Sequence, residues 1–292
     1  MSLVISQLIN GLQSGSIYAL IALGYSMVYG IIMLLNFAHG DVIMVGAYVA
    51  WLAMTRFALS PIIAIILAIL ACTLLGVIIE KVAYTPLRSS PRISLLITAI
   101  GISFLLENLA QKIFGAGAQR VPPLITGPAL EIAGQHISFT AMVTILVSIV
   151  SMILLTFLVH KTKMGKAMRA VSEDMGAAQL MGISVNRTIS FTFAVGSALA
   201  GIGSVLYCCA YPQAAPMMGS MLGLKAFVAA VLGGIGSLPG AMIGGFCIGI
   251  AESVVSAVGL SVWKDGVVFA ILIIVLIFKP TGILGKKMTE KV

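Results

Sequence analysis

Long runs of apolar residues, separated by short polar stretches, fill the chain from one end to the other. The runs cover residues 3–35, 42–54, 61–79, 93–114, 137–159, 189–210, 217–232, 241–258 and 262–278. A helix needs about 20 consecutive apolar residues to cross the hydrocarbon core of a bilayer, and most of these runs approach that length. The pattern predicts an all-α, polytopic membrane bundle of about eight transmembrane segments, with residues 1–292 forming a single transmembrane domain.

Two interruptions occur beside runs that are too short to cross a membrane in full. The first is the polar hexapeptide 36–41, which precedes the short run 42–54, and the second is the glycine-rich segment 233–240. Irregular backbone at membrane depth is tolerated only where protein or a water-filled cavity satisfies its polar groups. Broken or re-entrant helices along a translocation path are therefore one interpretation. Short loops at the membrane surface are the other.

Several residues in these interruptions could line such a path. They are Asn36, His39, Gly40, Asp41, Gly233, Gly234, Gly236 and Ser237. If a half-helix starts at Val42, Asp41 lies near its N-terminus, where a carboxylate offsets the positive end of the helix dipole. Contact of Asp41 with a transported solute or a gate is the alternative. The interruptions occupy comparable places in the two halves of the chain, but no residue-level similarity supports an internal repeat.

Composition agrees with a membrane protein and excludes other classes. Hydrophobic residues make up 60% of the chain, charged residues make up 9%, and the mean hydropathy is +1.14. In a soluble domain roughly a quarter of the residues are charged. The net charge of +8 comes from residues between apolar runs rather than from a basic stripe with aromatic residues, so nucleic acid is not an expected partner. The cysteines have no metal-ligand or redox spacing, so we expect neither metal nor cofactor.

Most basic residues fall in three connections, and these set the expected topology. The connections contain Lys81, Arg88 and Arg92, then Lys161, Lys163, Lys166, Arg169 and Arg187, and finally Lys279, Lys286, Lys287 and Lys291. Loops rich in Lys and Arg stay in the cytoplasm. The lipid bilayer is therefore the first partner, the C-terminus is expected in the cytoplasm, and counting crossings backwards places the N-terminus outside.

Few polar residues lie inside the apolar runs, and each is costly there, at roughly 2.5–3.5 kcal/mol for a charge at the bilayer centre. Glu107 and Asn108 lie within the run 93–114. Because Glu107 is poorly aligned with Lys112 on a helix, we expect it to face a polar cavity or a partner subunit. The alternative is that the helix ends early and Glu107 is interfacial. Lys225 and Glu252 could pair across the second interruption.

Glycines four residues apart follow the second interruption, at Gly236, Gly240 and Gly244 and again at Gly245 and Gly249. This spacing predicts close packing against a neighbouring helix. Catalysis is not expected of the chain, because it has no phosphate-binding Gly-x-x-x-x-Gly-Lys pattern and no constellation of nucleophile and base.

The longest polar connection, residues 164–183, has apolar positions from Ala167 to Met181 at nearly helical spacing. Arg169, Glu173 and Asp174 are available on the other side, and Gly182 is expected to end the helix as a C-terminal cap. A short amphipathic helix or helix pair outside the membrane is therefore predicted. It could lie on the membrane surface or dock into a groove of a partner protein.

Three stretches together resemble the permease family of branched-chain amino acid ABC importers. They read NFAHGDVIMVGAY (36–48), MGKAMRAVSEDMGAAQLMGI (164–183) and KAFVAAVLGGIGSLPGAMIGG (225–245). Supporting matches are GYSMVYGII (24–32), KVAYTPLRSS (81–90) and the tail PTGILG (280–285). The likeness covers nearly the whole chain and is to the shorter of the two permeases of the high-affinity leucine, isoleucine and valine system.

The resemblance implies a multi-pass protein of the bacterial plasma (inner) membrane that forms half of a translocation pore. The implied partners are a second, related permease, two cytosolic ATPase subunits and an external solute-binding protein, and ATP hydrolysis would reside in the ATPases. The connection containing Arg169, Glu173, Asp174 and Gly182 then looks like the helix that couples the permease to the ATPase. The two interruptions would line or support the path.

The sequence departs from the family pattern at two places, and alternative functions are compatible with it. Residue 41 is Asp where Glu is frequent in such proteins, and residues 115–135 match poorly. Urea or short amides are alternative substrates within the family. A self-sufficient channel or ion-coupled carrier is an alternative from another class.

Overall fold

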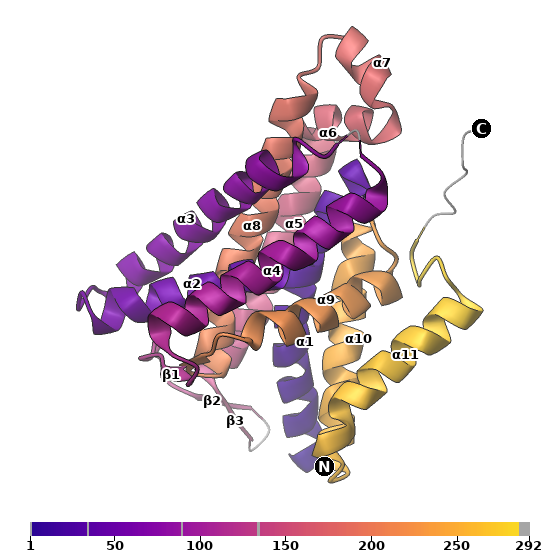
Figure 1. Ribbon diagram of the computed structural model, residues 1–292. Coiled ribbons are helices and arrows are strands. Elements are labelled where there is room, and N and C mark those ends of the chain that lie inside the picture. Colours follow the sequence, from indigo (N-terminus) through magenta and orange to yellow (C-terminus); the bar gives the residue numbers. More distant parts are fainter. Residues whose placement is uncertain (1, 34, 89, 133–134, 286–292) are drawn as a thin grey trace.

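The computed structural model describes residues 2–33, 35–88, 90–132 and 135–285 (Figure 1). The helices are α1 (Ser2–Ile32), α2 (His39–Thr55), α3 (Pro61–Ile79), the π-helical turn η1 (Glu80–Tyr84), α4 (Arg92–Phe114), α5 (Phe139–Lys161), α6 (Lys163–Glu173), α7 (Met175–Leu180), α8 (Val185–Ala210), α9 (Met218–Gly233), α10 (Leu238–Ala257), the 3-10 turn η2 (Ser261–Trp263) and α11 (Lys264–Phe278). Short strands are β1 (Gln119–Arg120), β2 (Leu130–Ile132), β3 (Gln135–Ile137) and β4 (Gln213–Ala214).

The helices follow from the requirement that backbone groups in lipid form their hydrogen bonds within the segment. Seven helices in the described part of the chain are long and apolar enough to cross a membrane, namely α1, α3 with η1, α4, α5, α8, α10 and α11 with η2. The first apolar run is a single helix that ends at Ile32. By contrast, α2 and α9 have 17 and 16 residues, as expected for the runs beside the two interruptions. The predicted all-α membrane bundle is confirmed.

The centre of the bundle is α1, which packs along α10 and is also flanked by α5, α8 and α9. Glycines make the contact with α10 close. A Cβ atom added at Gly15 would lie 2.9 Å from the Gly245 carbonyl oxygen, and one added at Gly249 would collide with the backbone of Gly11 and Gly15. The predicted close packing of the glycine series is confirmed, because two helix backbones touch here without side chains between them.

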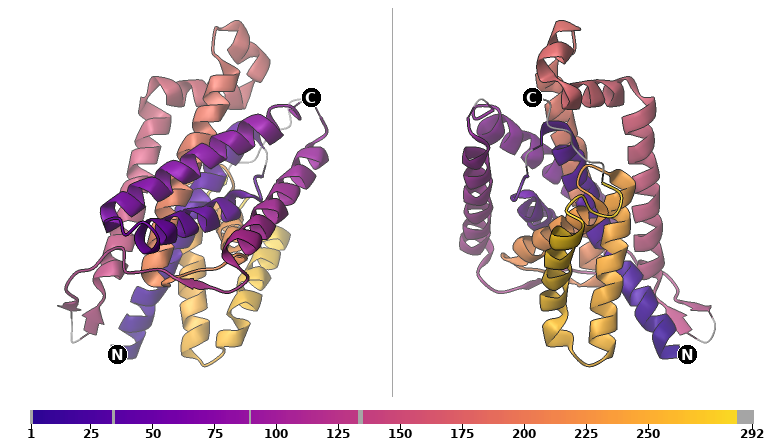
Figure 2. Two further views of the ribbon diagram at one scale, coloured as in Figure 1. Left: turned by 60° about the vertical axis from the view of Figure 1, so that its left-hand side comes forward. Right: turned by 90° about the vertical axis from the view of Figure 1, so that its right-hand side faces the viewer.

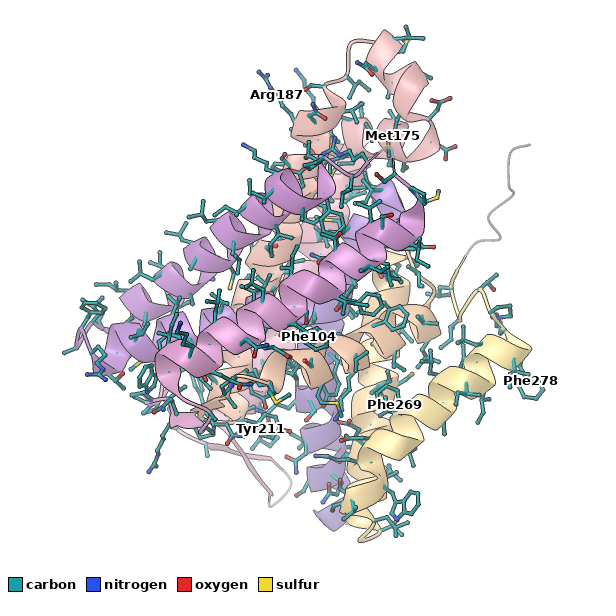
Figure 3. All side chains as sticks on the ribbon, in the orientation of Figure 1. Phe104, Met175, Arg187, Tyr211, Phe269 and Phe278 are labelled. Carbon is teal, nitrogen blue, oxygen red and sulfur yellow. The ribbon has the colours of Figure 1, made fainter. Side chains whose placement is uncertain are left out.

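The peripheral helices α3, α4, α5 and α11 expose apolar side chains on their outer faces. Phe104 on α4 is 60% exposed and Phe278 at the end of α11 is 81% exposed, and Figure 3 shows both at the outside of the bundle. In water such faces would be unfavourable, but lipid chains solvate them. These outer faces therefore mark the surface that lipid or other membrane helices cover.

The two ends of the bundle carry different structures, and both views in Figure 2 keep them apart. One end, here called the α6–α7 end, carries these two helices. The connection that follows η1 also lies at this end, where Arg88 donates to the Asn186 side chain at the start of α8 (2.5 Å). The other, the N-terminal end, has the α10–α11 turn, the β2–β3 hairpin and a two-residue pairing of β1 with β4. These strands were not predicted.

The α1–α10 contact can be tested with Gly249→Leu. The leucine side chain has no space against Gly11 and Gly15, so the change should destabilise the folded protein by about 1–3 kcal/mol or more and lower its thermal unfolding temperature in detergent. Gly101→Leu is the matched control, because nothing lies within 4 Å of a Cβ atom at Gly101. Equal unfolding temperatures for the two variants would contradict the contact.

Candidate translocation path and coupling helices

The first interruption is a bend between α1 and α2 rather than a break at residues 36–41. The backbone turns at Met33, whose φ is 53°, and α2 begins at His39. A half-helix start at Val42 is therefore wrong by one turn, and His39, Gly40 and Asp41 belong to the first turn of α2. Asp41 forms no capping hydrogen bond there, but its position at the helix N-terminus agrees with the expected dipole interaction. Asn36 is buried in the bend and lies 3.2 Å from the Tyr84 hydroxyl.

The first turn of α2 lies directly against the first turns of α9. A Cβ atom added at Gly40 would collide with the carbonyl of Gly219, and one added at Gly219 would lie 2.5 Å from the Asp41 carboxylate. His39 is buried on the other side, with its ring 4.9 Å from that of Tyr25. Small residues are thus required where the two short helices meet. The structure thereby packs the first interruption against the start of α9, the helix whose other end adjoins the second interruption.

Two buried carboxylates lie near this contact. Asp41 accepts a hydrogen bond from Ser103 of α4, and Glu107, one turn further along α4, accepts one from Ser220 of α9. Glu107 is only 3% exposed and α4 continues to Phe114, so the interfacial alternative for Glu107 is wrong. Asn108 does not join this cluster, because it is exposed and donates to the carbonyl of Phe104 in its own helix (2.7 Å).

The second interruption separates α9 from α10 at residues 234–237. Gly234 and Gly236 have φ values of 105° and 87°, which only glycine adopts readily. Ser237 caps α10 by accepting from the Gly240 amide (3.2 Å). The tail pairs with the end of α9, since the amides of Ile283 and Leu284 donate to the carbonyls of Leu232 and Gly233. The matching PTGILG tail therefore covers the interruption, a role that no sequence pattern indicated.

A cavity of about 550 Å³ joins this interruption to the polar connection. We call it the α6 cavity. Gly236 and Ser237 line it from the interruption, and Arg169 and Glu173 line it from α6. The ends of α1 and α5 complete its wall. The sequence singled out these two regions separately, and the structure places them on one cavity at the α6–α7 end.

The predicted amphipathic element is a helix pair. Asp174 ends α6 and caps α7, where its side chain accepts from the Ala177 amide (2.9 Å). Gly182, with a φ of 81°, closes α7 because the amides of Gly182 and Ile183 donate to the carbonyls of Gln179 and Ala178. This hydrogen-bond pattern is a Schellman motif, so the predicted C-terminal cap is confirmed.

The exposed face of α7 differs from the prediction. Met181, expected on the apolar face, is 83% exposed, and the neighbouring Leu180 is 91% exposed. Figure 3 shows α7 with Met175 beyond the spanning helices. The apolar periodicity correctly marked Val171 and Ala178 as buried. It could not mark Leu180 and Met181 as surface residues, because the pattern does not show that the described part of the chain leaves them uncovered.

A partly buried ionic cluster connects α9, α10 and α11. The ammonium of Lys225 in α9 lies 2.7 Å from the Glu252 carboxylate in α10 and 2.6 Å from the Asp265 carboxylate at the start of α11. Tyr18 of α1 donates to Glu252 (2.8 Å). The suggested Lys225–Glu252 pair is confirmed. Asp265 and Tyr18 were missed, because residues far apart in sequence gave no spacing signal.

A second cavity, of about 330 Å³, lies beside this cluster at the other end of the bundle. We call it the N-terminal cavity, and the beginning of α1 and the end of α10 form much of its wall. In the described part of the chain, no group of three or more His, Cys, Asp or Glu residues is arranged to hold a metal ion.

Membrane-length helices with a cavity towards each end, and a helix pair projecting beyond the spans, define the membrane subunit of a transporter. Residues 7–276 match the permease component of the branched-chain amino acid transport system, and the chain belongs to this family. The description of the matching family names branched-chain amino acids and not the urea or short amides considered above.

Relatives that are named for branched-chain amino acid transport match this chain over nearly its full length. The chain is 42% identical to the high-affinity branched-chain amino acid transport system permease protein BraD of Pseudomonas aeruginosa, over 99% of this chain and 98% of that protein. It is 43% identical to the corresponding protein LivH of Escherichia coli K12, over 99% and 97%. The structure of PsaBC from Streptococcus pneumoniae in complex with Fab has a TM-score of 0.50 at 16% identity, covering 93% of this chain and 91% of that chain, so its likeness concerns the fold.

The α4–α9 contact predicts the effect of Ser220→Ala. Removing this hydroxyl leaves the buried Glu107 carboxylate without its donor, which should cost about 1–3 kcal/mol and lower the unfolding temperature of the purified protein. Ser60→Ala is the control, because Ser60 is exposed and its side chain makes no capping hydrogen bond. If Ser220→Ala unfolds at the same temperature as the Ser60 variant, the Ser220–Glu107 bond contributes nothing.

Proposed function

We propose that this chain is one permease subunit of an ATP-binding-cassette importer that carries branched-chain amino acids across the bacterial plasma membrane. The observation that carries the proposal is the 43% identity, over nearly the whole chain, to a permease named for high-affinity branched-chain amino acid transport. The two cavities at opposite ends of the bundle support it, because a permease must expose its path to each side of the membrane in turn.

The α6–α7 end is proposed to face the cytoplasm. Lys81 and Arg88 lie in the connection at this end, as do the lysines and arginines of α6. Positively charged connections stay on the cytoplasmic side. In this orientation the N-terminus lies outside, the α6 cavity opens inwards and the N-terminal cavity opens outwards.

Two cytosolic ATPase subunits are the proposed partners of α6 and α7. Helix α7 lies beyond the spanning helices (Figure 1), and Leu180 and Met181 at its end expose apolar surface. An apolar helix face of this kind is buried when it enters a groove of a partner protein. Docking is thus favoured over a location on the membrane surface, because α7 projects beyond the spanning helices (Figure 1).

A second, related permease and an external solute-binding protein complete the proposed importer. The exposed apolar faces of the peripheral helices provide surface for another membrane subunit. The solute-binding protein would approach the N-terminal end, where the β strands and the N-terminal cavity lie. ATP hydrolysis is assigned to the ATPases, and this chain contributes half of the pore.

The proposed mechanism is alternating access driven from α6 and α7. Thr162 both ends α5 and caps α6, and α8 begins at Val185, three residues after Gly182 closes α7. Movement of the docked pair is therefore transmitted directly into two spanning helices. Because α6 also lines the α6 cavity, the same movement changes the opening beside the glycine interruption.

Docking predicts that Leu180→Asp combined with Met181→Asp releases the ATPases while the permease stays in the membrane. Two charges in an apolar groove should reduce co-purification of the ATPases by at least about tenfold, since each buried unpaired charge costs several kcal/mol. Val262→Asp is the control, because Val262 is equally exposed, at 94%, but lies at the opposite end. Normal co-purification of the double variant would exclude docking through α7.

A further inference from the structure

We propose that the N-terminal cavity is a binding site for the head group of a free α-amino acid, with Glu252 binding the ammonium group and Lys264 the carboxylate. The inference rests on the proposed function and adds to it a place on this chain where the transported molecule is recognised. The cavity, the ionic cluster and their position along α9 and α10 support it independently.

The cavity has the size and lining of a small polar site. Its volume of about 330 Å³ falls within the ~300–1,000 Å³ that small-molecule sites occupy. Successive turns of α1 line it with Gln7, Asn10, Gln13 and Ser14, while α10 contributes Glu252 and α11 contributes Lys264. Side-chain amides and hydroxyls both donate and accept hydrogen bonds, as an ammonium and a carboxylate on one ligand require.

The ionic cluster beside the cavity lacks one positive charge. Lys225 is the only ammonium that the described residues place within ion-pair distance of Glu252 and Asp265, so two carboxylates share one cation. Lys225 and Glu252 are each only 7% exposed, whereas the side chain of Asp265 is 37% exposed. An uncompensated charge in such surroundings is costly, and a further cation beside it is correspondingly stabilised.

Glu252 has room to accept that cation. One of its oxygens accepts from the Tyr18 hydroxyl and the other faces Lys225, whereas a carboxylate has about four acceptor positions. Glu252 also lies five residues before the end of α10, which places it about 8 Å below that end of the helix. A primary ammonium that enters the cavity reaches Glu252, and Lys225 keeps Asp265 as its partner.

The opposite charge of the ligand is met by Lys264. This side chain is exposed, lines the cavity and forms no ion pair with the residues that the structure describes. The cavity therefore presents a carboxylate at depth and an ammonium nearer the solvent. A zwitterion satisfies both, whereas an uncharged solute such as urea satisfies neither.

Binding at Glu252 would also act on the glycine interruption. Lys225 lies eight residues before Gly233, about 12 Å along α9, and its pair with Glu252 fastens α9 to α10. A ligand ammonium that binds Glu252 competes with Lys225 and weakens this ion pair between α9 and α10. Recognition at the N-terminal cavity is thereby connected to the segment between α9 and α10.

The test measures ligand binding by the assembled importer in nanodiscs, without the solute-binding protein. We expect millimolar L-leucine to raise the unfolding temperature of the wild-type complex. Glu252→Gln should weaken the binding of L-leucine, measured by the concentration needed for this rise, at least about tenfold, which corresponds to about 1.4 kcal/mol. Glu80→Gln is the matched control, because Glu80 is also a buried, ion-paired carboxylate but lies near Arg88 at the opposite end.

Leucine analogues and a second variant separate the two charges. Isopentylamine, which lacks the carboxylate, should bind the Lys264→Met variant as it binds the wild type, while L-leucine should bind that variant about tenfold more weakly. The deaminated analogue 4-methylpentanoate should not bind with comparable affinity to either. Because Lys264 is exposed, this variant remains informative if Glu252→Gln fails to fold.

The outcomes distinguish this inference from the proposed function. If the wild-type importer with its binding protein takes up leucine, but Glu252→Gln and Lys264→Met bind leucine unchanged, the N-terminal cavity is not the site. If the wild-type importer takes up no branched-chain amino acid on addition of ATP, the proposed function itself is wrong.

Discussion

The close packing of α1 against α10 is the contact on which the rest of the structure depends. Gly11 and Gly15 meet Gly245 and Gly249, so the two backbones touch and leave no space between them. Residues near the start of α1 and the end of α10 line the N-terminal cavity, and residues near the end of α1 and the start of α10 line the α6 cavity. The glycine contact therefore separates two cavities that open towards opposite ends. A permease with alternating access needs such a closed segment between two openings.

The remaining helices connect the cavities to the rest of an importer. The short helix α9 contacts Asp41 at one end of its length through Gly219, carries Lys225 in the ionic cluster, and ends at Gly233 beside the interruption. At the other end, α6 lines the α6 cavity and continues into α7, whose exposed apolar residues lie outside the spans. Because α5 and α8 flank α1 and adjoin this pair, the proposed coupling movement of α7 would reach the centre of the bundle through these two helices.

Much of the fold, but less of the site, could be predicted from sequence. Apolar runs reveal membrane helices because lipid demands internal hydrogen bonds, and Gly182 reveals a helix end because its positive φ disfavours other residues. The sequence placed the start of α2 after Asp41, because polar residues such as His39 and Asp41 are rare inside membrane helices. In the structure both belong to α2, where Ser103 donates to Asp41 and Gly219 leaves space beside it. The Tyr18–Glu252–Lys225–Asp265 cluster joins residues up to 247 positions apart, and only the packing of four helices brings it together. The exposure of Leu180 could not be predicted, because an apolar residue in an amphipathic pattern is expected on the buried face.

Cysteine accessibility tests the central claim, that the two cavities open alternately on either side of the α1–α10 contact. Ser14→Cys reports the N-terminal cavity and Thr156→Cys reports the α6 cavity, each in a chain whose four native cysteines are replaced. The rate of labelling by a water-soluble maleimide would be measured in the assembled importer with and without ATP and vanadate. The account predicts that the trapped state labels position 14 faster and position 156 more slowly. Rates that rise or fall together, or that do not respond to the trapped state, would contradict it.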